Sequence, residues 1–360
     1  MLDYLKQWYN RKFSDPNAVT LFLLLVFAVA TIVFFGSLLA PVLIALALAY
    51  LLDWPVSRLM NMGLSRLTAS IITFTLFVTI ALLVVVTLVP VIWQQSTTLI
   101  TELPEMLTNL QIWLHKLPEL FPAFVDQAQI NELVAGMRRR AIGLGEQLVT
   151  LSLSSLSSAM SVLVYLIVVP LLVFFMLKDR DELMSHLSRA LPSNRQLISQ
   201  VGQEMNLQIM NYIRGKAIEV VVVAIVSFIT FFSFDLRYAA LLSIMVGFSV
   251  LIPYIGAALV TIPVLLVAFF QFGPSSTFTW IAVAYFIIQA LDGNVLVPLL
   301  FSEAVSLNPV YIIAAVVVFG GIWGFWGVFF AIPLASLVKA VLTAWSSGIE
   351  NTIYEAKSTN

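Results

Sequence analysis

The chain has no cysteine and few charged residues. Cysteine is absent from all 360 positions, which excludes disulfide bonds, thiolate nucleophiles and sulfur-ligated metal sites. Charged residues make up 10% of the sequence, and the net charge of −1 gives no electrostatic basis for binding nucleic acid. The two histidines, His115 and His186, lie in different polar segments and do not suggest a zinc site. We therefore expect no metal site and no cofactor.

Five long stretches contain no charged residue at all. They are residues 19–52, 67–101, 147–177, 238–291 and 304–338. A helix needs about 20 apolar residues to cross about 30 Å of hydrocarbon, so each stretch is long enough to span a bilayer. A soluble domain could not bury this much apolar surface. The sequence predicts an all-α integral membrane protein with about eight transmembrane helices, two of them discontinuous or re-entrant, and a small extramembrane helical hairpin.

The N-terminal part, residues 1–93, is expected to hold membrane helices 1 to 3. The first apolar run is too long for the core of a signal peptide, which favours an uncleaved first span. Gly36 and Pro41 punctuate this run and predict two helices in succession. The third span is expected to end at Pro90 and Trp93.

Composition divides the rest of the chain into five segments. Residues 94–150 regain charges and carry two apolar stripes with helical spacing, which predicts a periplasmic helical hairpin. Residues 151–177 are expected to form membrane helix 4. Residues 178–216 contain two capping-box patterns and are expected to form cytoplasmic amphipathic helices. A C-terminal membrane bundle is expected over 217–341, followed by a cytoplasmic tail at 342–360.

The distribution of basic residues predicts the orientation. If the N-terminus is cytoplasmic, the segments on that side of the membrane carry most of the Lys and Arg residues, as the positive-inside rule requires. The run Arg138–Arg140 is an exception, but it lies well inside a long loop, where the rule has little force. Both termini are therefore expected in the cytoplasm.

Two apolar segments, 238–272 and 309–341, are too long for one crossing and are interrupted near their middles. The residues at the interruptions are Pro253, Tyr254 and Gly256 in the first segment and Gly320, Gly321, Gly324 and Gly327 in the second. Broken backbone at membrane depth is tolerated where it is buried in protein or lines a wet cavity, and transporters place substrate sites there. Simple kinks and close helix packing are the alternative.

Asp292 is the sharpest candidate for a binding residue. It follows Gln289 by three positions, so the two side chains would share one face of a helix, and Asn294 is close by. A carboxylate and amides beside weakened helix form a plausible site for a cation, a proton or a polar solute. The alternative is an interfacial loop between two spans, with Asp292 or Asn294 as a cap.

A second polar group is expected at the cytoplasmic mouth of the pathway. Its members are Arg214, Gly215, Lys216 and Glu219. Glu219 follows Lys216 by three residues, so a local ion pair at the membrane edge is the simpler interpretation. The secondary candidates are Glu303, Asn308 and Asp53. Asp53 precedes Trp54 and fits a helix-end residue better than a ligand.

Several motifs in combination resemble the autoinducer-2 exporter family of bacterial membrane proteins. They are Ala49–Pro55, Tyr212–Lys216, Ile252–Gly256, Gln289–Asn294, Asn308–Pro309 and Ile332–Leu334. The resemblance implies a multi-pass permease of the bacterial inner membrane that assembles as a homo-oligomer, with a pentamer as one candidate. Members of that family are associated with either autoinducer-2 export or sodium/proton antiport. Asn308 stands where the family often has His, which removes support for a proton relay there.

The expected function is export or permeation of a small polar solute, with autoinducer-2 suggested by the resemblance. A sodium/proton antiporter using Asp292 or Glu219 is the first alternative, and a non-transporting membrane scaffold is the second. An enzyme is not expected, because HExxH and GxSxG motifs are absent. No Walker A loop is present, so the sequence offers no internal ATP site. The expected partners are the lipid bilayer, the solute or cation, and further copies of the chain.

Overall fold

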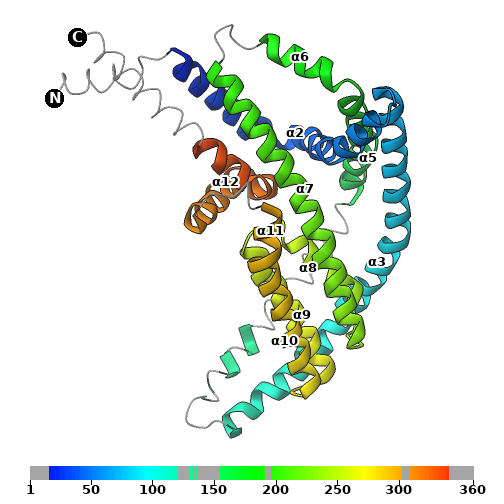
Figure 1. Cartoon of the computed structure of the whole chain (residues 1–360). Coiled ribbons are helices and arrows are strands. Elements are labelled where there is room, and N and C mark those ends of the chain that lie inside the picture. Colours follow the sequence, from blue (N-terminus) through cyan, green and yellow to red (C-terminus); the bar gives the residue numbers. More distant parts are fainter. Residues whose placement is uncertain are drawn as a thin grey trace, which may run out of the picture.

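The computed structural model is predominantly helical over the part of the chain that it describes (Figure 1). This part comprises residues 16–120, 126, 128, 130–132, 134–136, 155–190, 196–301 and 308–339. Within it, six helices are long and apolar enough to cross a membrane. Two shorter apolar helices, Val164–Lys178 and Ala239–Ser249, accompany them. The protein is therefore an all-α membrane protein.

The helices of the described part have the following bounds. In chain order they are α2 (Pro16–Asn61), α3 (Arg66–Leu120), α5 (Ser155–Lys178), α6 (Arg180–Ala190), α7 (Gln196–Ser233), α8 (Ala239–Ser249), α9 (Ile255–Phe272), α10 (Ser276–Leu291), the π-helical turn η1 (Asp292–Leu296), α11 (Val297–Phe301) and α12 (Pro309–Phe329). A further helical stretch covers residues 331–339.

Two expected helix ends are absent from the N-terminal part. Helix α2 continues through Gly36 and Pro41, where we expected two helices, and its ribbon changes direction partway along (Figure 1). Helix α3 continues through Pro90 and past Trp93, where we expected the third span to end. A proline removes one backbone hydrogen bond, and a membrane helix can accommodate this by bending rather than ending.

The continuity of α3 also changes the expected hairpin at 94–150. Its first arm is the distal half of α3, which passes through Pro104 without a break. The turn and most of the second arm lie outside the described residues. The expected boundary between residues 216 and 217 is likewise absent, because α7 is one helix from Gln196 to Ser233. Without an internal proline, nothing interrupts its hydrogen bonding at Gly215.

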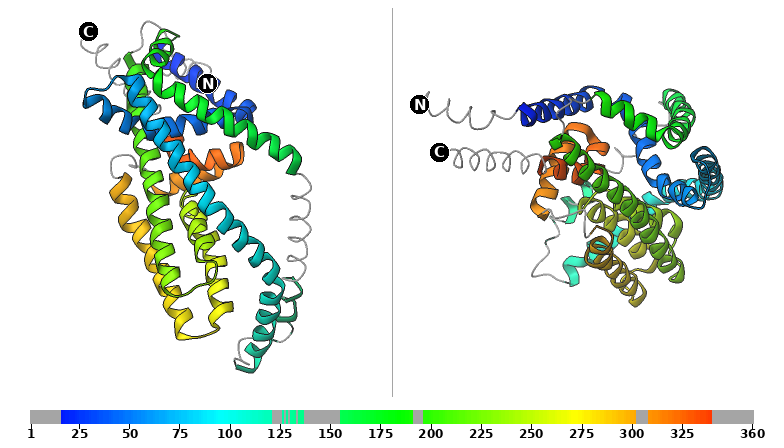
Figure 2. Two further views of the ribbon diagram at one scale, coloured as in Figure 1. Left: turned by 90° about the vertical axis from the view of Figure 1, so that its right-hand side faces the viewer. Right: turned by 45° about the horizontal axis from the view of Figure 1, so that its top comes forward.

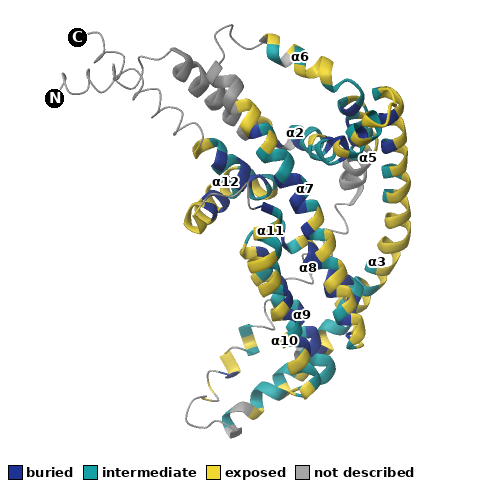
Figure 3. Ribbon diagram, in the orientation of Figure 1, coloured by how far each residue is buried: buried dark blue, intermediate teal, exposed yellow. Residues whose placement is uncertain are grey.

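The two largest clusters of buried side chains in the described part hold most of the helices together. One joins α2, the start of α3 and α5, with Ala45, Val56 and Val173 completely buried. The other joins α7, α8, α9 and α10, and the distal half of α3 contributes Met106. Between the clusters, α3 crosses the molecule with its apolar side chains exposed, as Figures 2 and 3 show. Acyl chains would cover this surface in a bilayer.

Candidate functional site

A backbone break separates α8 from α9 at residues 250–254. Pro253 has no amide hydrogen to donate, and Tyr254 has φ 62°, a left-handed value that costs a side-chain-bearing residue energy. A Cβ atom added to Gly256 would lie closer than 3.0 Å to the carbonyl oxygen of Ser249. The break therefore depends on the residue types that the sequence analysis singled out.

The far ends of α8 and α9 meet beside the end of α7. The Gln271 side chain accepts a hydrogen bond from the Arg237 amide at 2.7 Å and donates to the Asp235 carbonyl at 2.7 Å. Arg237 and Asp235 precede α8, whereas Gln271 lies near the end of α9. The two helices consequently run antiparallel, with the turn at 250–254 as the tip of a hairpin.

A second break lies inside α12. Gly324 has φ 61° and ψ −137°, which is not helical. A Cβ atom added to Gly327 would come closer than 3.0 Å to the carbonyl oxygen of Phe319, and one added to Gly320 would meet the Val328 side chain. The chain folds back closely on itself there. Gly321 differs, because no other atom lies within 4 Å of the position that a Cβ atom would occupy there.

Helix α7 contacts both breaks through two neighbouring turns. The Lys216 Nζ donates a 2.8 Å hydrogen bond to the Val250 carbonyl at the α8–α9 tip. The Tyr212 hydroxyl donates a 2.7 Å hydrogen bond to the Phe329 carbonyl just after the second break. These carbonyls lie where helices end, and such groups need partners from elsewhere when they are buried. Two side chains of α7 supply those partners.

Lys216 and Glu219 form a buried ion pair. Their charged atoms are 2.8 Å apart, and the residues are only 5% and 1% exposed. Lys216 also lies over the ring of Phe301 at 5.3 Å from its centroid, and Gly215 packs against the same ring. The expected i, i+3 pair is present. It lies deep among packed helices, and Arg214 interacts instead with Asp53 and Arg180.

Asp292 begins a π-helical turn that continues α10 into α11. The interfacial loop that we considered for this residue is absent, since the span is helical from Ser276 to Phe301. Asp292 interacts electrostatically with Lys216 and Glu219, so the structure groups the two predicted polar clusters. Single π-helical turns within α-helices are frequent at functional sites.

On α10 and η1, two polar atoms are buried without a hydrogen-bond partner among the described residues. They are Oδ1 of Asp292 and Nε2 of Gln289, which lie one turn apart. Asn294 is exposed, and its amide donates to the Ala290 carbonyl at 2.8 Å. Buried polar atoms are nearly always paired in folded proteins. The unpaired carboxylate and amide atoms could therefore hold a polar solute or a cation.

The secondary candidates have structural positions where they are described. Asp53 forms ion pairs with Arg66 and Arg180, both at 3.5 Å. Asn308 caps α12 by accepting a 3.0 Å hydrogen bond from the Val310 amide. Glu303 lies outside the described residues. Sequence reasoning gave no role to Tyr212, which had appeared only within the motif Tyr212–Lys216.

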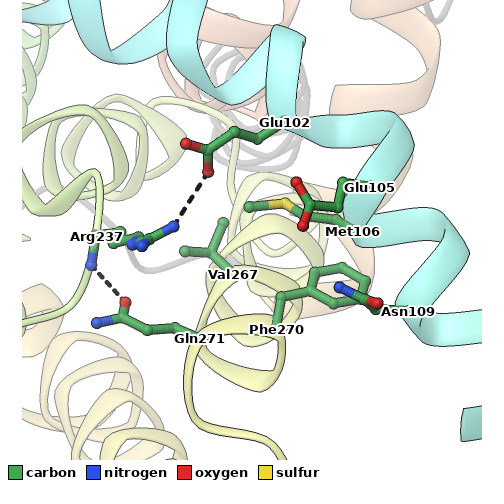
Figure 4. Close-up of a pocket in the computed structure, with 8 residues that line it drawn as sticks. All are labelled: Glu102, Glu105, Met106, Asn109, Arg237, Val267, Phe270 and Gln271. Atoms are coloured by element: carbon green, nitrogen blue, oxygen red, sulfur yellow. Dashed lines mark hydrogen bonds and ion pairs between the residues drawn. The ribbon is translucent and has the colours of Figure 1, made fainter.

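A polar clamp joins α3 to the base of the α8–α9 hairpin (Figure 4). Glu102 accepts a 2.6 Å hydrogen bond from the Tyr238 hydroxyl and pairs with Arg237 at 3.3 Å. Gln95, two turns earlier on α3, accepts a 2.8 Å hydrogen bond from the Leu241 amide in the first turn of α8. A cavity of about 320 Å³ adjoins Glu102 and Arg237. No motif in the sequence had marked these contacts.

Replacing Glu102 by Gln is expected to lower the free energy of unfolding by about 1–2 kcal/mol, because the clamp loses its charge. Burial, followed by the Glu102 contact, raises the pKa of Tyr238 to about 12 from 10.0. A raised pKa stabilises the fold below the unfolded value and loses that contribution as the pH passes through the folded value. The wild type should therefore lose stability between about pH 10 and 12 more steeply than the variant.

Thermal unfolding in detergent across this pH range measures both effects. The matched control is Glu105→Gln, which changes an exposed carboxylate on the same helix and the same cavity. Equal stability losses in the two variants would contradict the assignment of a clamp to Glu102.

The fold defines a polytopic helical membrane protein with a buried polar cluster among its helices. The family model described as AI-2E family transporter matches residues 21–347, and the chain belongs to this family. "Putative permease PerM" of Escherichia coli strain K12 is 52% identical over 97% of this chain and 99% of its own length.

More distant relatives carry transport names as well. "Putative transport protein YueF" of Bacillus subtilis strain 168 is 27% identical over 89% of this chain and 90% of its own. "AI-2 transport protein TqsA" of Escherichia coli strain K12 is 22% identical over 90% of this chain and 91% of its own. The chain is thus a membrane transport protein of the AI-2E family.

Proposed function

We propose that this protein is a permease of the bacterial inner membrane that moves a small polar solute past Asp292. The observation that carries the proposal is the pair of unpartnered buried atoms, Asp292 Oδ1 and Gln289 Nε2, beside the Lys216–Glu219 ion pair. Polar groups at membrane depth are costly and typically mark a pathway for substrates or ions. The solute would satisfy these atoms as it passes.

The α8–α9 hairpin fits a re-entrant segment in this proposal. Helix α8 has 11 residues and is about 16 Å long, which is near half of the about 30 Å hydrocarbon thickness. Its tip at Val250 lies against Lys216, in the middle of the span Gly202–Ser233. The reversal of the chain at Gly324 in α12 would place a second backbone break against the same helix, α7.

The proposed orientation places both termini in the cytoplasm. The turn between α2 and α3 then faces the cytoplasm with Arg58 and Arg66, in agreement with the positive-inside rule. The base of the α8–α9 hairpin and the clamp at Glu102 would lie toward the periplasm. The solute would meet the hairpin tip roughly midway between these two sides, which is where transporters with discontinuous helices bind substrate.

Asp292→Asn is expected to reduce transport by about ten- to a hundredfold, the effect of losing one charge-assisted hydrogen bond of about 1.5–3 kcal/mol. Uptake or efflux of autoinducer-2 in proteoliposomes is the first assay, since a relative carries that substrate in its name. Asn294→Ala is the matched control, because Asn294 is exposed and bonds only within its own helix turn.

The same vesicles distinguish the alternative functions. If an imposed sodium or proton gradient drives counter-flux in the absence of autoinducer-2, the assigned function becomes cation exchange and no longer solute export. An Asp292→Asn protein that transports at the wild-type rate would remove this carboxylate from either pathway. Absence of any flux from correctly folded protein, across a panel of ions and hydroxylated solutes, would favour a scaffold.

A further inference from the structure

A groove lies between the end of α2 and the start of α3, away from the proposed pathway. Its volume is about 380 Å³, and its lining is almost entirely apolar. Leu52, Trp54 and Arg58 line it from α2, while Ile72, Leu76 and Ile80 line it from α3. None of these six residues takes part in the buried cluster around Asp292, so the groove needs its own explanation.

The groove follows the axis of α3. Its lining on this helix runs from Ile72 to Ile80, which is about 12 Å along the helix. Half of the hydrocarbon core measures about 15 Å. Arg58 lies one turn before the end of α2, at the polar mouth of the groove. These dimensions match an acyl chain whose headgroup lies at the mouth.

Arg58 carries a positive charge that the described part of the chain does not neutralise. It is exposed and forms no ion pair or hydrogen bond there. Arg66, eight residues later, pairs with both Asp53 and Asp181. Trp54 is 57% exposed beside Arg58, and Trp is enriched where a membrane meets water. The mouth therefore complements a negatively charged headgroup.

We infer that this groove binds one anionic phospholipid. The phosphate contacts Arg58, and an acyl chain covers Leu76 and its apolar neighbours. Basic residues near the membrane surface attract anionic lipids, and basic pockets between spans select their headgroups. This site is independent of the transport pathway, so its test stands apart from the test of Asp292.

Native mass spectrometry of detergent-purified protein, titrated with phosphatidylglycerol or phosphatidylcholine, measures the site. The wild type should bind phosphatidylglycerol more tightly than phosphatidylcholine. Arg58→Gln should weaken phosphatidylglycerol binding about fivefold and remove the preference, which is the effect expected for one basic residue near the surface. Arg189→Gln, which changes another exposed arginine, should leave the preference intact.

A further variant tests the apolar part of the groove. Leu76→Trp fills the groove and should lower the binding of both lipids. Far-UV circular dichroism verifies that each variant keeps its helices. Equal affinity of the wild type for both lipids, or an unchanged preference in Arg58→Gln, would overturn the inference. Loss of self-association in Leu76→Trp, with no lipid bound to wild type, would assign the groove to a second copy.

Discussion

Lys216→Met is expected to lower the free energy of unfolding by about 3–5 kcal/mol, since removing one partner of a buried ion pair leaves the other uncompensated. Glu219 is 1% exposed and would remain as a stranded carboxylate. The Val250 carbonyl would also lose its donor at the tip of the α8–α9 hairpin. Unfolding in mild detergent, followed by far-UV circular dichroism as the denaturant rises, measures the change.

A double-mutant cycle separates the stranded charge from the lost packing. Glu219→Gln removes the carboxylate charge and retains most of the side-chain shape. The double variant Lys216→Met, Glu219→Gln should be more stable than Lys216→Met alone, because the variant pair leaves no uncompensated charge at these two positions. Asp292 interacts with Lys216 as well, so part of the loss should persist. Simple addition of the two single losses would contradict a buried ion pair that holds the hairpin tip.

The role of this pair is structural and electrostatic at once. Lys216 holds the backbone at one break, and Tyr212 holds it at the other. The two residues lie one turn apart on α7, a helix that packs against α8, α10 and α11. A change of charge at Lys216 would therefore act on the hairpin tip and on the surroundings of Asp292 together. The backbone at the break and the electrostatic surroundings of Asp292 are therefore linked through one side chain.

The membrane class and the two breaks could be predicted because both depend on local sequence. A charge-free run of sufficient length has few alternatives to a spanning helix. Pro253 cannot donate a backbone hydrogen bond and Gly324 tolerates a positive φ, so each residue favours a break at its own position. The placement of Asp292 and Gln289 on one face of a helix follows in the same way from their spacing.

The continuous helices could not be predicted from the same residues. Pro41 and Pro90 lie within helices, whereas Pro253 lies at a break, although each lacks the amide hydrogen. What differs is the surrounding packing, which decides whether the chain bends or turns. The partners of Lys216, Tyr212 and Glu102 lie far away in sequence, at separations of 34, 117 and 136 residues. The helical periodicity of the sequence does not indicate which residues form such distant pairs.

Gly256→Ala is expected to prevent the tight approach of α9 to the end of α8 and to abolish transport. The new Cβ would come closer than 3.0 Å to the backbone carbonyl of Ser249, which cannot rotate away as a side chain could. Overpacking typically costs about 1–3 kcal/mol, and here the backbone of the break must move as well. Gly327→Ala should act similarly against the Phe319 carbonyl at the second break.

Gly321→Ala is the matched control, since it makes the same chemical change in α12 with nothing within 4 Å of the new atom. It should retain transport and gain slightly in stability, because alanine favours a helix over glycine by about 1 kcal/mol. Transport rates in proteoliposomes and thermal midpoints in detergent distinguish the three variants. If Gly256→Ala behaved like Gly321→Ala in both measurements, residue 256 would not approach the Ser249 carbonyl as closely as the structure shows. A folded but inactive Gly256→Ala would instead place the close approach of these two helices within the transport cycle itself.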